Sequence, residues 1–249
     1  MRQTHIFTRI LLLILLVQSF IATGQKTVLF DEHHGQIFST EKSGILQLSG
    51  LSEIFNEEGW MVKTCNSEIT DEVLTGVDAL IITGAFKPVT VQETEAINRF
   101  IENGGKLSVM LHIGSPFSNL LHTLNVAISN SVIHEVENII EDNDLNFRVL
   151  DLKKHDLFNK LKLFNVYGGW ALMPLKDNAQ IIAQTSEKAW IDLNNDKEAD
   201  AQQAFGTVVV GNVGKGHFVV FSDDALFQNH FLKDENYQLG KNLAKWLKM

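Results

Sequence analysis

The sequence predicts an α/β fold: a doubly wound, mainly parallel sheet followed by a C-terminal β-hairpin and a closing helix. Three observations predict it. Apolar runs alternate with amphipathic stretches between residues 27 and 112, with short connections. The run Ala79–Ile82 is wholly apolar, as expected of a strand that is covered on both faces. Two late runs, 205–211 and 216–222, flank a glycine-containing turn, which is typical of a hairpin.

The first 24 residues have the pattern of a secretory signal peptide. Arg2 and Arg9 precede the apolar stretch Ile10–Ala22, and Ala22-Thr-Gly24 provides small residues for cleavage before Gln25. An uncleaved anchor is the alternative, but about a dozen apolar residues fall short of the ~20 that span a bilayer. We therefore expect a periplasmic or secreted protein with a single domain over residues 25–249 and no stable membrane span after cleavage.

Net charge and cysteine content limit the kinds of partner and the covalent chemistry that the sequence predicts. Cleavage removes two arginines, leaving 19 Lys and Arg against 30 Asp and Glu, a net charge of −11. An acidic chain without a basic run is a poor binder of polyanions, so we expect no nucleic-acid partner. The single cysteine, Cys65, leaves no internal disulfide. It ends an apolar run, so we expect a packed strand residue, with a reactive thiol as the minor alternative.

The predicted elements follow in order up to residue 112. Leu46, Leu51 and Phe55 belong to the apolar stripe of a first helix that ends at Gly59. Thr70 is expected to open a short helix, and Thr90 with Glu93 forms a capping box. The expected strands are 27–30, 60–65, 77–83 and 106–112, and the expected helices are 45–58, a short one from 70, and 90–103.

Beyond Gly114 the pattern loosens. A short helix is expected over 117–124, and the runs 147–150, 164–167 and 179–184 are expected as strands and connectors. The hairpin then leads to a closing helix over 237–248.

Ionisable residues are concentrated directly after the first strand: Asp31, Glu32, His33 and His34, followed by Gly35. In open α/β sheets, ligands bind outside the carboxyl ends of the strands. Alternation along an extended chain would place Asp31 and His33 on one side and Glu32 and His34 on the other. A carboxylate beside an imidazole suits a general base, and the same residue types ligate zinc. The structural alternative is that Asp31 caps the next turn and His34 packs beneath Gly35.

Two later strand ends add candidates. His112 and Ser115 leave the fourth strand, which we expect to lie beside the first. Ser115 lacks the G-x-S-x-G pattern of a nucleophile elbow and is expected to cap the next helix. Asp223 follows the last strand, with a helix cap as the alternative. The catalytic candidates are Asp31, Glu32, His33, His34 and His112, and the ligand-binding candidates are Gly35, Gly84, Ser115 and Asp223.

An acidic loop provides a candidate calcium site. Asp192, Asn194 and Asp196 have the spacing of the first EF-hand ligands, and Asp200 follows. The sixth position is Lys197 instead of glycine, and the twelfth is Gln203 instead of glutamate. A true EF-hand is therefore not expected. A weak extracellular-type Ca²⁺ site and a solvated loop are the two alternatives, and no other cofactor is predicted.

Several segments together resemble a known fold. Val28-Leu-Phe-Asp-Glu-His-His-Gly35, Asp78-Ala-Leu-Ile-Ile82, Gly104-Gly-Lys-Leu107, Gly214-Lys-Gly216 and Trp246-Leu247 appear in the order found in class I glutamine-amidotransferase-like, flavodoxin-like domains. The chain resembles the gliding and intraflagellar-transport (GIFT) domain and a related bacterial domain of unknown function. The resemblance extends from about Lys26 to Lys248.

The resemblance implies a non-amidotransferase role. Glutamine amidotransferases carry a Cys nucleophile after the fourth strand, where this chain has His112-Ile-Gly-Ser115. Part of a motif of some related bacterial domains is kept at His112, Pro116 and Phe117, although Leu111 replaces an acid. Those domains accompany enzymes that remove unsaturated uronic acids from polysaccharides. The first hypothesis is a ligand-binding or accessory protein in polysaccharide (uronate) use, with a small-molecule or oligosaccharide ligand. A hydrolase or lyase that uses the Asp31–His34 cluster with His112 is the second, and a protein-interaction module is the third. Gly168-Gly-Trp170 offers an aromatic residue that is either exposed near a sugar-sized cleft or buried.

Overall fold

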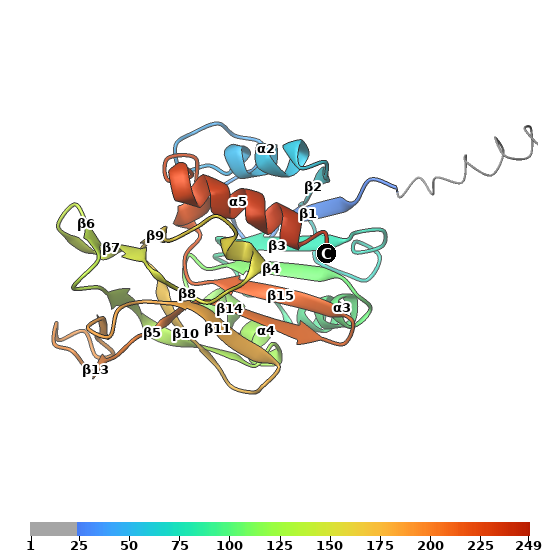
Figure 1. Cartoon of the computed structure of the whole chain (residues 1–249). Coiled ribbons are helices and arrows are strands. Elements are labelled where there is room, and N and C mark those ends of the chain that lie inside the picture. The colour runs from blue at the N-terminus through green and yellow to red at the C-terminus, as the bar shows by residue number, and fades with distance from the viewer. Residues whose placement is uncertain (1–23) are drawn as a thin grey trace, which may run out of the picture.

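The computed structural model describes residues 24–249, and all but one residue of the predicted signal peptide lies outside this range. Five parallel strands form one end of a twelve-stranded sheet, in the order β2, β1, β3, β4 and β15, with β2 at the edge (Figure 1). Their bounds are Met61–Cys65 for β2, Thr27–Asp31 for β1, Ala79–Thr83 for β3, Lys106–Met110 for β4 and Gly216–Phe221 for β15.

The register brings four strand ends together at one edge. Asp31 pairs with Ile82, Thr83 with Met110, and Met110 with Phe221. The loops that leave β1, β3, β4 and β15 therefore emerge side by side, and we call this edge the carboxyl rim. β3 lies between β1 and β4, so the expected adjacency of the first and fourth strands was wrong.

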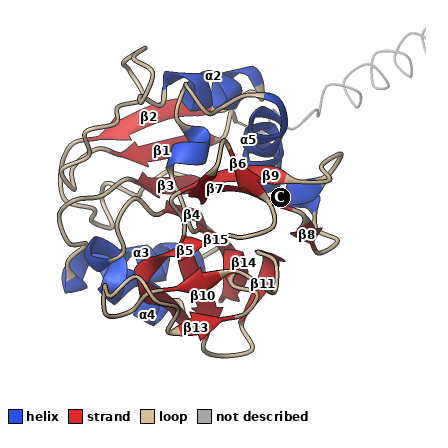
Figure 2. Cartoon of the chain, turned by 90° about the vertical axis from the view of Figure 1, so that its left-hand side faces the viewer, coloured by secondary structure: helices blue, strands red, loops and turns tan. Residues whose placement is uncertain are grey.

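The rest of the large sheet is antiparallel. β14 (Gly206–Val213) pairs with β15 through the predicted hairpin, and it also pairs with β11 (Ala179–Gln184) and β10 (Trp170–Pro174). The other strands are β5 (Val126–His134), β8 (Asp151–Leu152), β12 (Trp190–Ile191) and β13 (Ala201–Gln202). The predicted α/β class with a parallel core is confirmed. The sheet is mixed, because the chain after residue 126 adds antiparallel strands (Figure 2).

A small second sheet extends from this antiparallel half. It contains β6 (Ile139–Ile140), β7 (Asn143–Val149) and β9 (Phe164–Tyr167) in the order β6–β7–β9. β9 and β11 have the predicted bounds, whereas β7 begins four residues earlier than its apolar run.

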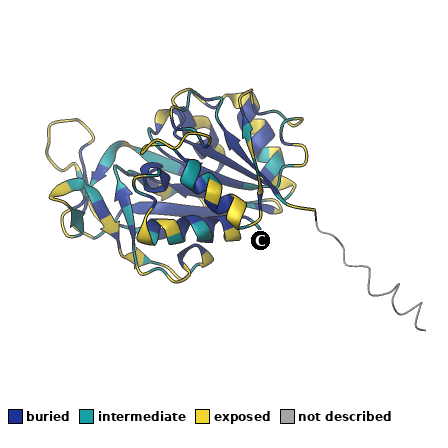
Figure 3. Cartoon of the chain, turned by 90° about the horizontal axis from the view of Figure 1, so that it is seen from above, coloured by how far each residue is buried: buried dark blue, intermediate teal, exposed yellow. Residues whose placement is uncertain are grey.

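Helices cover both faces of the parallel strands (Figures 1 and 2). α2 (Ser49–Glu57) and α5 (Asp234–Trp246) pack on one face, and α3 (Val91–Glu102) and α4 (Ser118–Thr123) pack on the other. Three short 3₁₀ helices, η1 (Ser115–Phe117), η2 (Asp156–Phe158) and η3 (Ala225–Phe227), complete the elements. Two apolar cores result, one on each side of buried strands (Figure 3). No helix within residues 24–249 is both long and apolar enough to cross a membrane.

The structure confirms some of the predicted local features and contradicts others. The capping box of α3 is present, with Glu93 N donating to Thr90 Oγ1 and Thr90 N donating to the Glu93 carboxylate. Cys65 is 5% exposed at the end of β2, which confirms the packed strand residue. Leu46 is 44% exposed and precedes α2, so its place in the stripe was wrong. Residues 71–76 form turns, so Thr70 opens no helix.

Candidate functional site

The first cluster at the carboxyl rim is centred on His34. Its Nδ1 lies 2.7 Å from Asp31 Oδ2, and its Nε2 lies 3.1 Å from the Glu93 carboxylate. The residue is only 2% exposed. Burial disfavours the charged ring, but the hydrogen bonds and charges of Asp31 and Glu93 outweigh it and raise the pKa of His34. Because both ring nitrogens are engaged, His34 has no free nitrogen for a ligand.

The expected alternation after β1 was wrong. β1 ends at Asp31, and the chain then turns, so that the imidazole of His34 meets the Asp31 carboxylate, whereas His33 donates only its backbone N–H to it. His33 points elsewhere, with its Nδ1 3.2 Å from the backbone oxygen of Asn66. The Glu32 carboxylate accepts bonds from Thr40 N at 2.9 Å and Thr40 Oγ1 at 2.8 Å. The four side chains therefore do not converge on one open pocket.

Gly35 serves the same folded loop. Its φ of +73° lies in the left-handed region, which favours glycine. The backbone oxygen of His34 accepts from Phe86 N at 2.9 Å and Lys87 N at 2.8 Å. This ties the loop after β1 to the loop after β3.

Glu93 is a residue of this cluster that sequence reasoning missed. It was assigned only to the helix cap, yet it also accepts from Ile69 N at 3.0 Å and contacts His34. Burial opposes its charge, but these hydrogen bonds lower its pKa to about 2. The available signal was a carboxylate at the first turn of a helix whose amino end faces the first strand's histidines.

The second cluster contains His112 and Asp224. His112 Nδ1 lies 3.0 Å from Asp224 Oδ1, and the Asp224 side chain is fully buried while that of His112 is 35% exposed. The ring packs against both Phe38 and Phe86, at centroid distances of 5.1 and 5.2 Å. No partner for His112 Nε2 is found in the part of the chain that the structure describes. The hydrogen bond to Asp224 raises the pKa of His112 against the opposing effect of burial.

Of the two consecutive acids after β15, it is Asp224 that serves the rim. Asp223 is 2% exposed, and its oxygens accept from Tyr167 N at 2.7 Å and Ala225 N at 2.8 Å. Burial, and then the neighbouring Asp224, raise the pKa of Asp223 to about 8. Both Asp223 oxygens thus hold backbone, which does not support its predicted role in ligand binding. Asp224 Oδ2 has no hydrogen-bond partner among residues 24–249.

The remaining rim candidates are divided. Gly84 lies directly against Asp224 with a φ of +56°, inside the site. Ser115 is exposed, and neither η1 nor α4 has a side-chain cap, so its predicted capping role was wrong. Trp170 is partly buried, and its Nε1 donates to the backbone oxygen of His112 at 3.1 Å. The indole is therefore part of the wall around His112.

The acidic loop is held by its own backbone. Asp192 accepts from the backbone amides of Asn194, Asn195 and Lys197, which lower its pKa although burial opposes them. Asp200 Oδ2 likewise accepts from Leu193 N at 2.7 Å. Within residues 24–249, no group of three or more His, Cys, Asp or Glu side chains is placed to hold a metal ion. Calcium binding here stays a prediction without geometric support.

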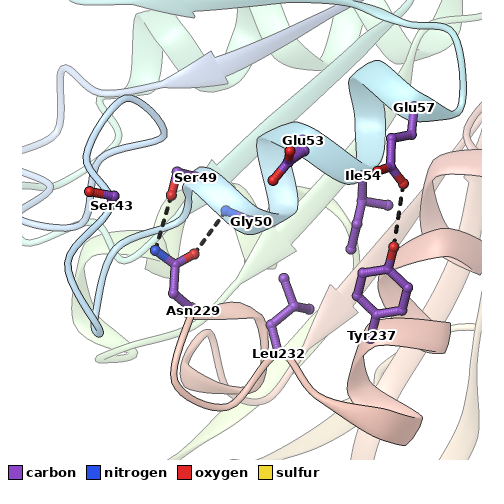
Figure 4. A pocket seen from close by; sticks show the side chains of 9 residues that line it. All are labelled: Ser43, Ser49, Gly50, Glu53, Ile54, Glu57, Asn229, Leu232 and Tyr237. Atoms are coloured by element: carbon purple, nitrogen blue, oxygen red, sulfur yellow. Dashed lines mark hydrogen bonds between the residues drawn. The ribbon is translucent and has the colours of Figure 1, made fainter.

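A hollow of about 350 Å³ lies away from the rim, between α2 and α5 (Figure 4). Glu53 and Glu57 line one wall, and the ring of Tyr237 faces them. Asn229 closes one end, accepting from Gly50 N at 2.8 Å and donating to Ser49 Oγ at 3.0 Å. This hollow, which we call the α2–α5 groove, is acidic on the side of Glu53 and Glu57 and apolar at Ile54 and Leu232.

Two imidazole nitrogens at the rim, Nε2 of His112 and Nε2 of His33, have no partner within residues 24–249, and of these two rings only that of His112 is held by a buried carboxylate. A buried carboxylate fixes Nδ1 of His112, which leaves Nε2 to donate when the ring is charged and to accept when it is neutral. This arrangement suits either recognition of an anion or proton transfer.

Comparison with known proteins agrees with the fold. No family model matches the chain. It is 26% identical over 137 residues to the intraflagellar transport protein 52 homolog of Mus musculus, a match that covers 49% of this chain and 31% of that protein. The chain thus spans about a third of the length of that relative.

Solved structures give the same result. The mmIFT52 N-terminal domain superposes with a TM-score of 0.71 and 19% identity, covering 89% of this chain and 97% of that one. A ThuA-like protein from Bacteroides uniformis superposes with a TM-score of 0.56 and 13% identity, covering 92% and 94%. The chain therefore has the amidotransferase-like fold of the GIFT domain.

Proposed function

We propose that this chain is a ligand-binding or accessory protein, and that it binds an acidic sugar or oligosaccharide at the carboxyl rim. One observation supports this most directly. The second ring nitrogen of His112 has no partner in residues 24–249, and its first is fixed by buried Asp224, whereas the ring of His33 is held only by a backbone oxygen. Such a side chain is held in place on one side and is free to meet a ligand on the other.

The surroundings of His112 favour an acidic, ring-shaped ligand. The raised pKa of His112 favours the imidazolium form, which pairs with a carboxylate such as that of a uronate. Phe86 is 39% exposed beside the imidazole of His112, and the partly buried indole of Trp170 donates to the backbone oxygen of His112. These rings offer flat apolar surface to the face of a sugar. With the apolar stretch before residue 24, the site supports a role in polysaccharide use outside the cytoplasm.

The test is to measure the binding of digalacturonate by calorimetry at pH 5.5 and at pH 8. We expect saturable binding that is stronger at pH 5.5, because the imidazolium is more populated there. His112→Gln should lose at least tenfold in affinity, whereas His122→Gln, an exposed histidine on α4, should bind as the parent does. Equal binding by all three proteins, or none by the parent, would overturn the proposal.

A hydrolase or lyase is the second candidate, supported by the His112–Asp224 pair. A buried carboxylate that orients an imidazole with one free nitrogen is the arrangement of a general base. In a lyase, His112 Nε2 would take the proton beside the uronate carboxylate. The bond to the leaving sugar oxygen would break, and that oxygen would take up a proton. Ultraviolet absorbance of an unsaturated product that depends on His112 would distinguish this activity from binding alone.

An interaction module is the third candidate. The intraflagellar transport protein 52 homolog is similar in sequence to about half of this chain. The mmIFT52 N-terminal domain is similar in structure to nearly all of it. The α2–α5 groove offers Glu53 and Glu57 to a basic side chain of a protein partner. Replacing both glutamates by glutamine should abolish such an interaction while leaving uronate binding unchanged.

A further inference from the structure

The segment between β8 and β9 folds around an open hollow of about 660 Å³. The segment contains η2 and packs against α5, where the imidazole centroid of His155 lies 5.6 Å from that of the Trp246 indole. None of the residues that line this hollow belongs to the carboxyl rim or to the α2–α5 groove. It is therefore a separate feature of the surface.

Lysines are concentrated at this hollow, although the chain as a whole is acidic. Residues 153–162 contain four lysines and one aspartate, whereas the predicted mature chain carries a net charge of −11. Three of the lysines, Lys153, Lys154 and Lys160, line the hollow and are exposed. The hollow thus gathers positive charge that the overall composition does not reveal.

Two further ionisable residues line the hollow, His155 and Asp156. Burial lowers the pKa of the His155 ring against the opposing charge of Asp156, so the ring is neutral at pH 8. Three lysines and one aspartate therefore leave a charge of about +2 around the hollow at that pH.

No carboxylate neutralises these lysines. Within residues 24–249, no ion pair includes Lys153, Lys154 or Lys160. Lys188, by contrast, lies 2.7 Å from the Glu137 carboxylate. Like charges that line one hollow repel one another, so an anion placed among them would be favoured.

The backbone that carries the lysines is fixed from two sides. Asn242 on α5 donates from Nδ2 to the backbone oxygens of Leu157 at 2.9 Å and Asn159 at 2.8 Å. The buried ring of Phe158 stacks on that of Phe164 at a centroid distance of 5.9 Å. An anion would therefore meet a loop that is already ordered, which lowers the entropic cost of binding.

We propose that this hollow binds a phosphate dianion, either free or as the monoester of a small molecule. The charge of the lining matches the two negative charges of such a group, whereas a single uronate carries one. Each lysine ammonium group offers three donors to phosphate oxygens and acts as a point charge. The hollow is larger than a phosphate ion, which leaves room for the molecule that carries the phosphate.

The experiment is a titration with glucose 6-phosphate at pH 8, where its phosphate is a dianion. The backbone amide signals of Lys154 and Lys160 are followed by NMR in a buffer without phosphate. We expect saturable shifts, with an affinity about tenfold higher than for glucuronate, and no shift with glucose. Inorganic phosphate distinguishes the two sources of the anion. Equal affinity assigns the site to free phosphate, and weaker affinity assigns it to the ester.

A double variant tests the lysines themselves. Lys153→Gln/Lys154→Gln should bind glucose 6-phosphate about tenfold more weakly than the parent. The matched control is Lys42→Gln/Lys63→Gln, which removes the same charge at two exposed lysines outside the hollow and should bind as the parent does. His112→Gln should also bind as the parent does, so failure of uronate binding at the rim would leave this inference unaffected.

Three results would overturn the inference. One is the absence of saturable shifts in the parent protein, and another is equal affinity for glucose 6-phosphate and glucuronate. The third is an equal loss of affinity in the two double variants, which would mean that the anion responds to net charge and not to this hollow.

Discussion

Gly84 lies against Asp224 so closely that a Cβ atom on Gly84 would be 2.7 Å from Asp224 Oδ2 and 3.1 Å from the Phe38 ring. The position also has a φ of +56°. The loop after β3 thus comes so close to the Asp224 carboxylate that only a glycine fits at position 84. Gly84 thereby contributes to the shape of the rim without contributing a functional group.

Gly84→Ala should destabilise the protein by about 2–4 kcal/mol, combining left-handed backbone strain with displacement of Asp224. Urea unfolding measures the loss. Gly76→Ala is the matched control, since Gly76 has a φ of +74° but nothing within 4 Å of its Cβ position. It should lose only about 1–2 kcal/mol. Equal losses in the two variants would show that the contact with Asp224 is unimportant.

Asp224→Asn should lower the pKa of His112. The hydrogen bond that His112 donates to the Asp224 carboxylate is the largest cause of the raised pKa, and an amide has no charge to replace that of the carboxylate. NMR titration of the His112 ring protons in both proteins measures the change. An unchanged pKa would mean that Asp224 is already protonated in the parent protein and would remove the basis of an anion site.

Stability should depend on pH through His34 and Glu93 in opposite directions. Glu93 has a pKa lowered from 4.5 to about 2, so its contribution is present above pH 4.5 and is lost as pH falls toward 2. The pKa of His34 is raised from 6.5, so its contribution is present below pH 6.5 and is lost as pH rises through the raised value. The cluster therefore stabilises the fold most between about pH 4.5 and 6.5.

Glu93→Gln tests this window. The unfolding free energy of this variant should fall less steeply below pH 4.5 and above pH 6.5 than that of the parent. Glu95→Gln, an exposed change on the same helix, should keep the parental profile. Identical pH profiles for Glu93→Gln and the parent would contradict the proposed linkage.

Asn229→Ala should cost about 1–2 kcal/mol, as expected for the loss of a helix cap. Asn229 Oδ1 accepts from Gly50 N at the start of α2, and its Nδ2 donates to the Gly44 oxygen and to Ser49 Oγ. His230→Ala, at the neighbouring exposed residue, should change the unfolding free energy by less than about 0.5 kcal/mol. Losses of similar size in both variants would show that these bonds contribute little.

The sequence predicted the parallel half of the fold well because its signals are local. The run Ala79–Ile82, the glycine at 59 and the capping box at Thr90 each act within a few residues of themselves. The order of the strands in the sheet, by contrast, depends on the path of the connections between strands, which contacts distant in the sequence determine. The neighbour of β1 could not be read from spacing, and the expected pairing with the fourth strand failed.

The sequence predicted that the candidate residues lie at the carboxyl ends of the strands, but not which of them contact one another. His112 is where the strand pattern placed it, and its partner Asp224 comes from a strand 112 residues further along the chain. In the dense cluster Asp31–His34, only Asp31 and His34 contact one another, with Glu93 on the other side of the His34 ring. The side chains of Glu32 and His33 bind other parts of the loops. Counting ionisable residues does not distinguish groups that hold a loop from groups that meet solvent.

The Glu93 carboxylate joins three segments that are distant in the chain. It accepts from Thr90 at the start of α3, from Ile69 after β2, and contacts His34 after β1. The backbone amides of Ile69 and Thr90 should therefore lose protection from hydrogen exchange together, at one common opening free energy, instead of fraying one by one. A helix cap, normally the first part of a helix to open, is in this molecule part of a cooperative unit that includes the end of the first strand.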